Sequence, residues 1–294
     1  LLTGSPGSGK TMLARRLPGI LPEMTLDEAF EVTRIRSVAG LLPERASLVT
    51  TRPFRVPHHH VSLAGLVGGG TGIARPGEVT LAHNGVLFLD ELTLYSKAVL
   101  ESLRAPLEDE VVRIARSGGS VTYPCRFSLV AAMNPCPCGY EGDPRRACRC
   151  EDYRKEIYRA RLSGPLLDRF DMQVSMQRLT GKELMSAPDG EDSATVRARV
   201  EAARAIQARR YGSSLTTNAS VRTSVLREEI ALSVPAHDFA RRAVDQSLLT
   251  GRGLDRLMRV ARTIADLDGL PMVDEVHIGR ALQLRTDIAA PVMA

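Results

Sequence analysis

The sequence predicts an α/β fold, a parallel sheet with helices on both faces, followed by a small all-α domain. A glycine-rich loop that opens a helix near residue 10 and two apolar runs that end in polar residues predict the α/β part. These runs, 86–91 and 127–134, are typical of buried parallel strands. A third observation, the lack of a strand pattern after about residue 176, predicts that the second domain is helical.

A phosphate-binding motif forms the first loop. It is the run Gly4-Ser5-Pro6-Gly7-Ser8-Gly9-Lys10-Thr11, which fits the pattern G-x-x-x-x-G-K-[ST] of P-loop NTPases. Glycines let successive backbone N–H groups turn towards an anion, and the positive end of the following helix faces the same anion. In this pattern Lys10 contacts the β- and γ-phosphates of ATP, and Thr11 offers its hydroxyl to Mg²⁺. The alternative is a Gly/Ser-rich turn before an unrelated helix.

The domain organisation follows from length and from one linker. A polar stretch at 188–192 precedes a basic, helix-forming segment, so we expect an α/β domain over 1–188 and a helical lid domain over 192–294. A phosphate-binding loop needs a strand in front of it, and Leu1–Thr3 supplies only the tail of one. We therefore expect the chain to be a fragment that lacks an N-terminal domain.

Composition and charge set wide limits on what the protein binds. The chain has 294 residues, 44% of them hydrophobic, and a net charge of +5. This charge favours polyanions such as nucleotides or nucleic acid only weakly, and an ordinary basic protein fits it equally well. No run of about 18 apolar residues occurs, so we expect no membrane segment and a cytoplasmic location.

Polar residues follow the two apolar runs. Asp90 and Glu91 end the first run, and Asn134 ends the second. The carboxyl ends of parallel strands are where α/β sheets bind ligands. We expect Asp90 to hold Mg²⁺ through water and Glu91 to polarise the attacking water. Asn134 is expected to orient that water or to sense the γ-phosphate.

Four of the five cysteines form two Cys-x-Cys pairs. The pairs are Cys136 with Cys138 and Cys148 with Cys150, whereas Cys125 precedes a strand and fits a core position. Four thiolates suit a tetrahedral structural Zn²⁺, but the spacing differs from the common Cys-x₂-Cys form. Free thiols and disulfides remain as alternatives, and a reducing cytosol disfavours disulfides.

Two further segments lack a helical pattern. The stretch 51–72 contains prolines, three adjacent histidines at 58–60 and a glycine run. We expect a structured loop there rather than a metal site, because adjacent side chains converge poorly on one ion. Residues 111–123 are predicted to form a β-hairpin with a Gly-Gly tip. Its Arg113 and Arg116 either touch a phosphate backbone or are solvated charges.

Apolar spacing and capping residues predict the helices. Thr25 followed by Asp27 and Glu28 is typical of a helix start. The expected helices cover residues 10–17, 26–40, 76–83, 96–107, 153–162, 193–211, 223–231, 236–247, 254–267 and 274–286.

These motifs together resemble the AAA+ ATPases, and within them the magnesium-chelatase-like ComM/YifB family. The matching segments are Gly4–Thr11, Arg52–Ser62, Gly68–Leu92, Asn134–Gly139, Ser163–Asp171 and Gly251–Leu267. They span nearly the whole chain. The stretches Arg-Pro-Phe-Arg-Val-Pro-His-His and Pro-Gly-Glu-Val-Thr-Leu-Ala-His-Asn-Gly are more specific to that family than the phosphate loop is.

The resemblance implies a role for each motif. The nucleotide site of the family is matched by Lys10 and Thr11 as Walker A, Asp90 and Glu91 as Walker B, and Asn134 as sensor 1. Arg169 matches the arginine finger, which reaches the γ-phosphate of the neighbouring subunit. The alternative is a surface arginine that pairs with Asp168 or Asp171.

The resemblance extends to the lid and the loops. Arg252 is the best match for the sensor 2 arginine, and Arg256 follows one turn later. The segment 53–72 resembles the helix-2 insert, and 111–123 resembles the pre-sensor-1 hairpin, which face the central pore in related ring motors. Proteins of the ComM type also carry an N-terminal domain that resembles the Lon protease domain.

The resemblance implies a ring-forming motor, commonly a homo-hexamer, with ATP bound between subunits. The leading hypothesis is a helicase that moves along single-stranded or branched DNA and migrates branches during recombination in natural transformation. One alternative is a chelatase-type subunit that powers metal insertion into a porphyrin, which the Cys-x-Cys pairs and the Pro-His-His loop argue against. The other is a nucleotide-gated interaction module with little turnover, which Glu91 and Arg169 argue against.

Overall fold

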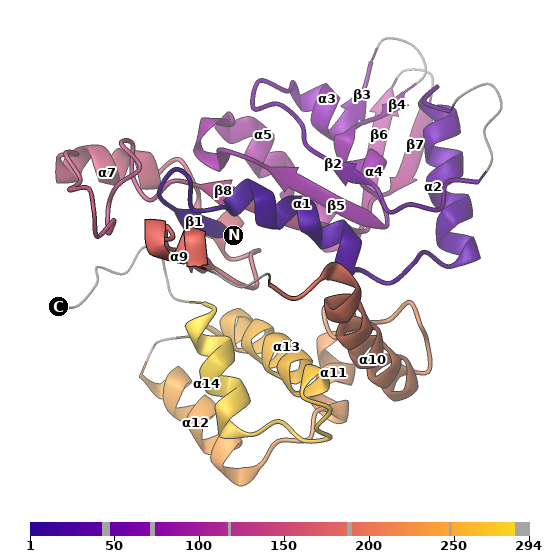
Figure 1. Cartoon of the computed structure of the whole chain (residues 1–294). Helices are drawn as coiled ribbons and strands as arrows, with labels where there is room; N and C mark the ends of the chain where they lie inside the picture. Colours follow the sequence, from indigo (N-terminus) through magenta and orange to yellow (C-terminus); the bar gives the residue numbers. More distant parts are fainter. Residues whose placement is uncertain (43–47, 71–73, 117–118, 187–189, 247–248, 286–294) are drawn as a thin grey trace. The chain divides into compact units, whose positions relative to one another are not determined.

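Two compact units make up the chain (Figure 1). The computed structural model describes residues 1–42, 48–70, 74–116, 119–186, 190–246 and 249–285. Unit 1 comprises Leu1–Gly19, Glu23–Phe170 and Ser175–Pro188. Unit 2 comprises Ile20–Pro22, Asp171–Val174 and Asp189–Ala294. No helix among the described residues is both long and apolar enough to cross a membrane.

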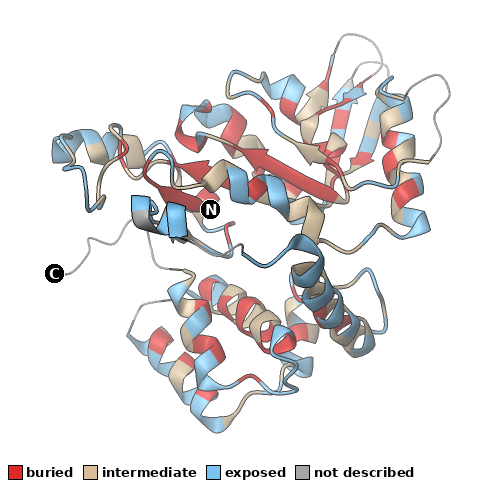
Figure 2. Ribbon diagram, in the orientation of Figure 1, coloured by how far each residue is buried: buried red, intermediate tan, exposed pale blue. Residues whose placement is uncertain are grey.

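A parallel sheet carries the phosphate loop of unit 1. Among the described residues, five strands lie in the order β2-β5-β8-β1-β9. They are β1 (Leu2–Gly4), β2 (Phe54–Arg55), β5 (Gly85–Leu89), β8 (Phe127–Met133) and β9 (Val174–Met176). The pairs β2–β5, β5–β8 and β8–β1 are all parallel. Every residue of β5 is buried, because its apolar run has to be covered on both faces (Figure 2).

Helices and short turns connect these strands. They are α1 (Lys10–Ile20), α2 (Leu26–Val38), α3 (Leu63–Val67), α4 (Glu78–Leu81), η1 (Leu92–Leu94), α5 (Lys97–Ser102), α6 (Arg104–Asp109), α7 (Asp152–Arg159), α8 (Gly164–Leu167) and α9 (Gly181–Ser186). The predicted start of α2 is confirmed. Thr25 accepts a hydrogen bond from the Glu28 backbone N–H, and the Glu28 carboxylate accepts one from Thr25 N–H. The predicted fold, a parallel sheet with helices and a helical second part, is confirmed.

The helix predicted over 96–107 is wrong as a single element. The chain forms two shorter helices, α5 and α6, which meet at Leu103. Pro106 has no N–H to bond the carbonyl of Ser102, so the hydrogen-bond ladder cannot run through this point. Pro106 lies instead in the first turn of α6, where a missing N–H costs little.

The predicted hairpin is confirmed. β6 (Val111–Arg116) pairs antiparallel with β7 (Gly119–Pro124), and Val112 faces Tyr123. Arg113 is exposed and lies 3.3 Å from the Asp109 carboxylate, so in this chain it is a solvated ion pair. The Arg116 side chain, the first glycine of the tip and residues 71–73 of the 53–72 segment lie outside the described residues.

Helices make up the described part of unit 2 beyond residue 192. They are α10 (Ser193–Tyr211), α11 (Thr223–Glu229), α12 (Val234–Asp245), α13 (Gly251–Leu267) and α14 (Glu275–Gln283). The buried residues that form the core include Leu257, Val260 and Ala261 of α13 and Ile278 and Ala281 of α14. The ends of the helices predicted over 236–247 and 274–286, at residues 247 and 286, lie outside the described residues.

Candidate functional site

The strand order brings three segments of unit 1 to one edge of the sheet. β1, β8 and β5 are neighbours and run parallel, so their carboxyl ends lie side by side. The loop 4–10 follows β1, Asp90 and Glu91 follow β5, and Asn134 follows β8. The sequence places these segments far apart, and the topology places them next to one another.

Lys10 connects the phosphate loop to Asn134. Its ammonium donates to the carbonyl oxygens of Gly4 at 2.6 Å and Ser5 at 3.1 Å, and to Asn134 Oδ1 at 3.3 Å. Partial burial lowers the pKa of Lys10, and the negative charge of Asp90 opposes that shift. The lysine head group is therefore held at the centre of the loop by oxygen acceptors.

Thr11 and Asp90 form the second contact across the site. The Thr11 hydroxyl donates to Asp90 Oδ2 at 2.8 Å, and the other carboxylate oxygen accepts the Glu91 backbone N–H at 3.0 Å. A hydroxyl beside a carboxylate is a donor set that suits Mg²⁺. Glu91 is exposed and has a left-handed backbone with φ of 52°, a strained conformation for this residue type.

Glycines shape the loop itself. Gly7 and Gly9 have φ of 80° and 87°, which favours glycine over other residues. Gly4 is fixed for a different reason, because a Cβ there would lie 2.3 Å from the carbonyl oxygen of Met176. The remaining loop residues, Ser5, Pro6 and Ser8, lie between these glycines, and Ser8 N–H donates to Ser5 O at 3.2 Å.

The two stretches that are most specific to the expected family contact each other. Arg55 of the first stretch forms two hydrogen bonds, of 2.6 and 2.7 Å, with the carboxylate of Glu78 in the second. This pairing raises the pKa of Arg55. Tyr95 donates from its hydroxyl to Pro57 O at 2.6 Å and so anchors the histidine loop; its position was not anticipated from the sequence.

Arg169 is folded back onto its own chain. It pairs with Glu108 and donates to Pro165 O at 2.7 Å, and only 7% of its side-chain surface is exposed. The alternative to the arginine finger, a surface arginine paired with Asp168 or Asp171, is wrong about the partner, which is Glu108. Glu108 lies 61 residues away in the sequence, and no local pattern identifies it.

The sensor 2 candidates lie in unit 2. Arg252 is exposed in the first turn of α13, which begins with a Thr250 cap. Arg256, one turn later, lies 4.0 Å from the Asp171 carboxylate. The role of Arg252 stays a prediction.

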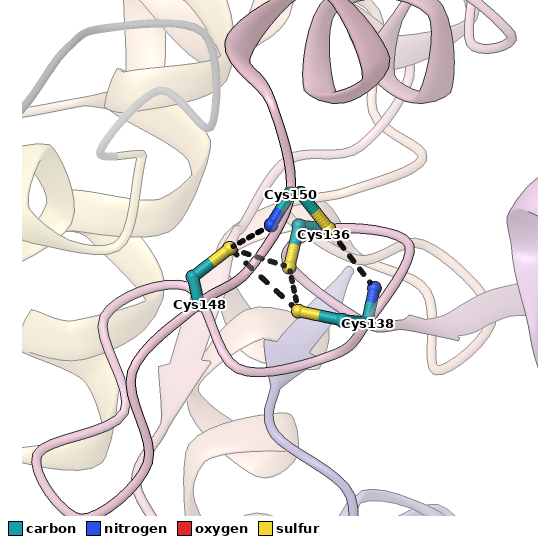
Figure 3. Close-up of side chains that lie close together, drawn as sticks. All are labelled: Cys136, Cys138, Cys148 and Cys150. Atoms are coloured by element: carbon teal, nitrogen blue, oxygen red, sulfur yellow. Dashed lines mark hydrogen bonds between the residues drawn. The ribbon is translucent and has the colours of Figure 1, made fainter.

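The four paired cysteines form one cluster (Figure 3). Cys136 Sγ lies 3.4 Å from Cys138 Sγ and 3.6 Å from Cys148 Sγ, and Cys138 Sγ lies 3.6 Å from Cys148 Sγ. All four sulfurs, including that of Cys150, lie within 4.8 Å of one another. None of these thiols is in a disulfide, and Cys125 is buried elsewhere. Desolvation raises the pKa of Cys138, but several hydrogen bonds together outweigh it and lower the pKa to about 6.

The histidine run has a different geometry. The rings of His58 and His59 stack with centroids 4.2 Å apart, and the His59 and His60 centroids lie 4.3 Å apart. The rings contact one another instead of converging on a common point. Among the described residues, the grouped side chains that could hold a metal are the four cysteines.

Comparison with known proteins places this site in a family. The family model for magnesium chelatase subunit ChlI matches residues 1–184, and the model for the ChlI C-terminal part matches residues 190–285. An uncharacterized protein of Mycobacterium tuberculosis is 51% identical over 279 residues, which are 94% of this chain and 55% of that protein.

Two further relatives have names. Competence protein ComM of Haemophilus influenzae is 43% identical over 289 residues, and protein YifB of Escherichia coli is 41% identical over 288 residues. Each alignment covers 97% of this chain and 55% of the relative, so the chain spans about half the length of the curated relatives it matches. The resemblance found in the motifs is thereby confirmed, and the chain belongs to the magnesium chelatase family, with ComM and YifB among its relatives.

Proposed function

We propose that the chain is the nucleotide-hydrolysing part of an AAA+ ATPase that binds ATP with Mg²⁺. The observation that supports this most strongly is the pair of contacts Lys10–Asn134 and Thr11–Asp90, which join three separate segments at one edge of the sheet. In this proposal Lys10 leaves its carbonyl partners for the β- and γ-phosphates. Thr11 and Asp90 hold Mg²⁺, Glu91 polarises the attacking water, and Asn134 orients that water.

The proposed ATPase works as a ring of identical subunits, six by family resemblance. Arg169 serves as the arginine finger for the neighbouring subunit's γ-phosphate, where it stabilises the charge of the transition state. Its present partner Glu108 has 58% of its side chain exposed, so water can solvate that carboxylate when Arg169 moves to a phosphate. Arg252 is proposed as the sensor 2 residue in the lid.

DNA is the proposed substrate of the ring. A net charge of +5 and the exposed Arg113 of the hairpin support a polyanionic partner. The name of a 43%-identical relative, a competence protein, supports DNA over other polyanions. We propose branch migration on single-stranded or branched DNA as the activity of the whole protein, in the cytoplasm.

We further propose that the four clustered cysteines bind structural Zn²⁺. A zinc–sulfur bond of about 2.3 Å in a tetrahedron gives sulfur–sulfur distances of about 3.8 Å. The three distances among the sulfurs of Cys136, Cys138 and Cys148, 3.4 to 3.6 Å, are close to this value and far from the length of a disulfide, about 2.05 Å.

A second candidate function is that of a chelatase subunit, because the matching family models are those of magnesium chelatase. In that case ATP hydrolysis would power metal insertion by a partner protein. DNA would then leave the hydrolysis rate unchanged.

The test is the ATP hydrolysis rate of the full-length protein with and without a four-way DNA junction or single-stranded DNA. The DNA motor predicts a several-fold higher rate with DNA and a steep loss of this stimulation as salt rises. Hydrolysis that proceeds equally with and without DNA would contradict the DNA substrate while leaving the ATPase in place.

A further inference from the structure

We propose that the four-cysteine cluster positions the nucleotide site: a zinc ion held there fixes the phosphate loop and Asn134, so that loss of the metal weakens ATP binding. This inference rests on the proposed zinc and nucleotide sites and adds a coupling between them. The contacts that the segment between Cys136 and Cys150 makes with the nucleotide site support this inference.

The cluster begins two residues after Asn134. β8 ends at Met133, and Cys136 is fully buried. Only Pro135 therefore separates Asn134, the residue proposed to orient the water, from Cys136, a proposed zinc ligand. A ligand fixed at Cys136 limits how far Asn134 can move.

Gly139, in the segment between Cys136 and Cys150, lies against the phosphate loop. A Cβ on Gly139 would lie 2.8 Å from Cδ of Pro6 and 3.8 Å from the Asn134 amide carbon, so the glycine backbone lies against both residues. Its φ of 84° is also left-handed. Gly139 follows the ligand Cys138 directly, so the position of this contact depends on the position of that sulfur.

Asp143 of the same segment lies near the phosphate loop as well. The carboxylate of Asp143 accepts the backbone N–H groups of Arg145 and Arg146 at 2.9 and 3.1 Å. The Arg145 N–H, followed by the nearby Ser5 hydroxyl, lowers the pKa of Asp143 below its usual value, so the carboxylate lies close to Ser5. Ser5 itself is buried and carries one of the carbonyl groups that hold Lys10. The segment between the cysteines thus contacts Pro6 of the phosphate loop through Gly139 and brings the Asp143 carboxylate near Ser5.

Apolar packing contributes little to the shape of this loop, which is held by polar contacts such as those of Asp143 and Glu141. Most of residues 139–147 are exposed or half-buried, and the stretch Gly-Tyr-Glu-Gly-Asp-Pro-Arg-Arg-Ala offers few apolar side chains for a core. A bound metal ion can order a small polar loop, because the free energy of metal binding stabilises the folded conformation of the loop.

Backbone N–H groups already surround the sulfurs in the way a zinc–thiolate centre requires. Cys138 N–H donates to Cys150 Sγ at 3.4 Å, and Cys150 N–H donates to Cys148 Sγ at 3.4 Å. Such outer hydrogen bonds orient metal ligands and offset the negative charge of four thiolates. Helix α7 follows Cys150 in the sequence, and it contacts the loop through Arg159, whose guanidinium donates to the Glu141 carboxylate at 2.7 Å.

The experiment measures three quantities on the purified chain and its variants: zinc content, ATP affinity, and hydrogen exchange of the backbone N–H groups of residues 4–11. Cys148→Ser removes a ligand, and Gly139→Ala keeps all four ligands but places a methyl group against Pro6. Cys125→Ser is the matched control, because Cys125 is a buried cysteine outside the cluster. Circular dichroism checks that each variant is folded.

We expect about one zinc per wild-type chain, retained in Cys125→Ser and Gly139→Ala and lost in Cys148→Ser. Exchange in residues 4–11 should become faster when zinc is chelated from the wild type, and also in Cys148→Ser and Gly139→Ala without chelation. The same changes should weaken ATP binding about tenfold or more, whereas Cys125→Ser leaves both unchanged.

The outcomes separate the parts of the argument. A wild-type chain that takes up no zinc, even when ZnCl₂ is added, overturns the inference. Zinc loss without a change in the exchange of residues 4–11 also overturns the inference, because the metal would then order only the segment between the cysteines. If the zinc-dependent change in exchange occurs but the wild type does not bind ATP, the coupling stands and the proposed nucleotide function fails.

Discussion

Lys10 shows how one side chain organises the candidate site. Its ammonium is held by the carbonyl groups of Gly4 and Ser5 and by the amide oxygen of Asn134. These acceptors are neutral, whereas a triphosphate is strongly negative. A bound nucleotide therefore offers stronger, charge-assisted hydrogen bonds than the loop does.

We predict that Lys10→Ala strongly weakens nucleotide binding. The loss of a charge-assisted contact to two phosphates should raise the dissociation constant of MgATP by about a hundredfold, or close to 3 kcal/mol. Titration with a fluorescent ATP analogue measures this. Lys97→Ala, which removes an exposed lysine at the start of α5, is the control and should bind as the wild type does. Equal affinities for the two variants would contradict the role of Lys10.

The residues of the site differ in how far the sequence reveals them. Lys10, Thr11 and Asp90 follow from a local pattern, because a phosphate loop and an apolar strand with a terminal acid have fixed spacings. Glu108 as the partner of Arg169, and Gly139 as a contact of Pro6, depend on how distant segments pack. No short pattern encodes such contacts, so they could not be predicted.

At the scale of elements, α13 is stabilised by a buried charge cluster within unit 2. The side chains of Asp266 and Arg262 are 0% and 1% exposed, and Arg262 Nε donates to Asp266 Oδ1 at 3.1 Å. Asp266 Oδ2 also accepts from Arg210 at 3.0 Å and from the Asn218 amide at 2.8 Å. Four polar groups thus satisfy one another in the interior.

We predict that Asp266→Ala strongly destabilises the helical part. It leaves the buried Arg262 charge without its carboxylate, which typically costs about 3–5 kcal/mol. Urea unfolding measures the change as a lower midpoint at an unchanged slope. Asp245→Ala removes a carboxylate from an exposed pair with Arg241 and should change the stability little. A small effect in both variants would show that the cluster contributes no more than a surface ion pair.

The bounds of a helix were predicted well where capping residues mark both of its ends. The bounds of α10 match the prediction, because Asp192 caps its start and Gly212 takes a left-handed conformation at its end. The prediction over 96–107 failed because the apolar spacing continues across the junction of α5 and α6 at Leu103, where Pro106 cannot donate to the carbonyl of Ser102. β9 has three residues, too few to show a period, and the order of the strands in the sheet cannot be read from local patterns at all.

At the scale of the whole molecule, the proposed mechanism needs more than one copy of the chain. In a single chain, Arg169 is engaged by Glu108 and Pro165. An arginine finger acts on a nucleotide held by a neighbour. In this mechanism Arg169 pairs with Glu108 in the single chain, and in the assembled ring it contacts the neighbour's γ-phosphate instead.

We predict that Arg169→Ala lowers ATP hydrolysis about a thousandfold in assembled rings without weakening ATP binding by single chains. The hydrolysis rate per subunit, measured on fractions whose assembly state is known from light scattering, provides the check. Glu108→Ala removes only the resting partner and should hydrolyse ATP at least as fast as the wild type. Normal hydrolysis by Arg169→Ala rings would remove the finger assignment.

The central claim is that one edge of the sheet in unit 1 binds MgATP and that Glu91 activates the water that attacks it. The most direct measurement compares ATP binding and phosphate release of the wild type and Glu91→Gln. We predict that Glu91→Gln binds MgATP as tightly as the wild type and releases phosphate roughly a hundredfold more slowly, the usual contribution of a general base. Phosphate release at the wild-type rate by Glu91→Gln would contradict the claim.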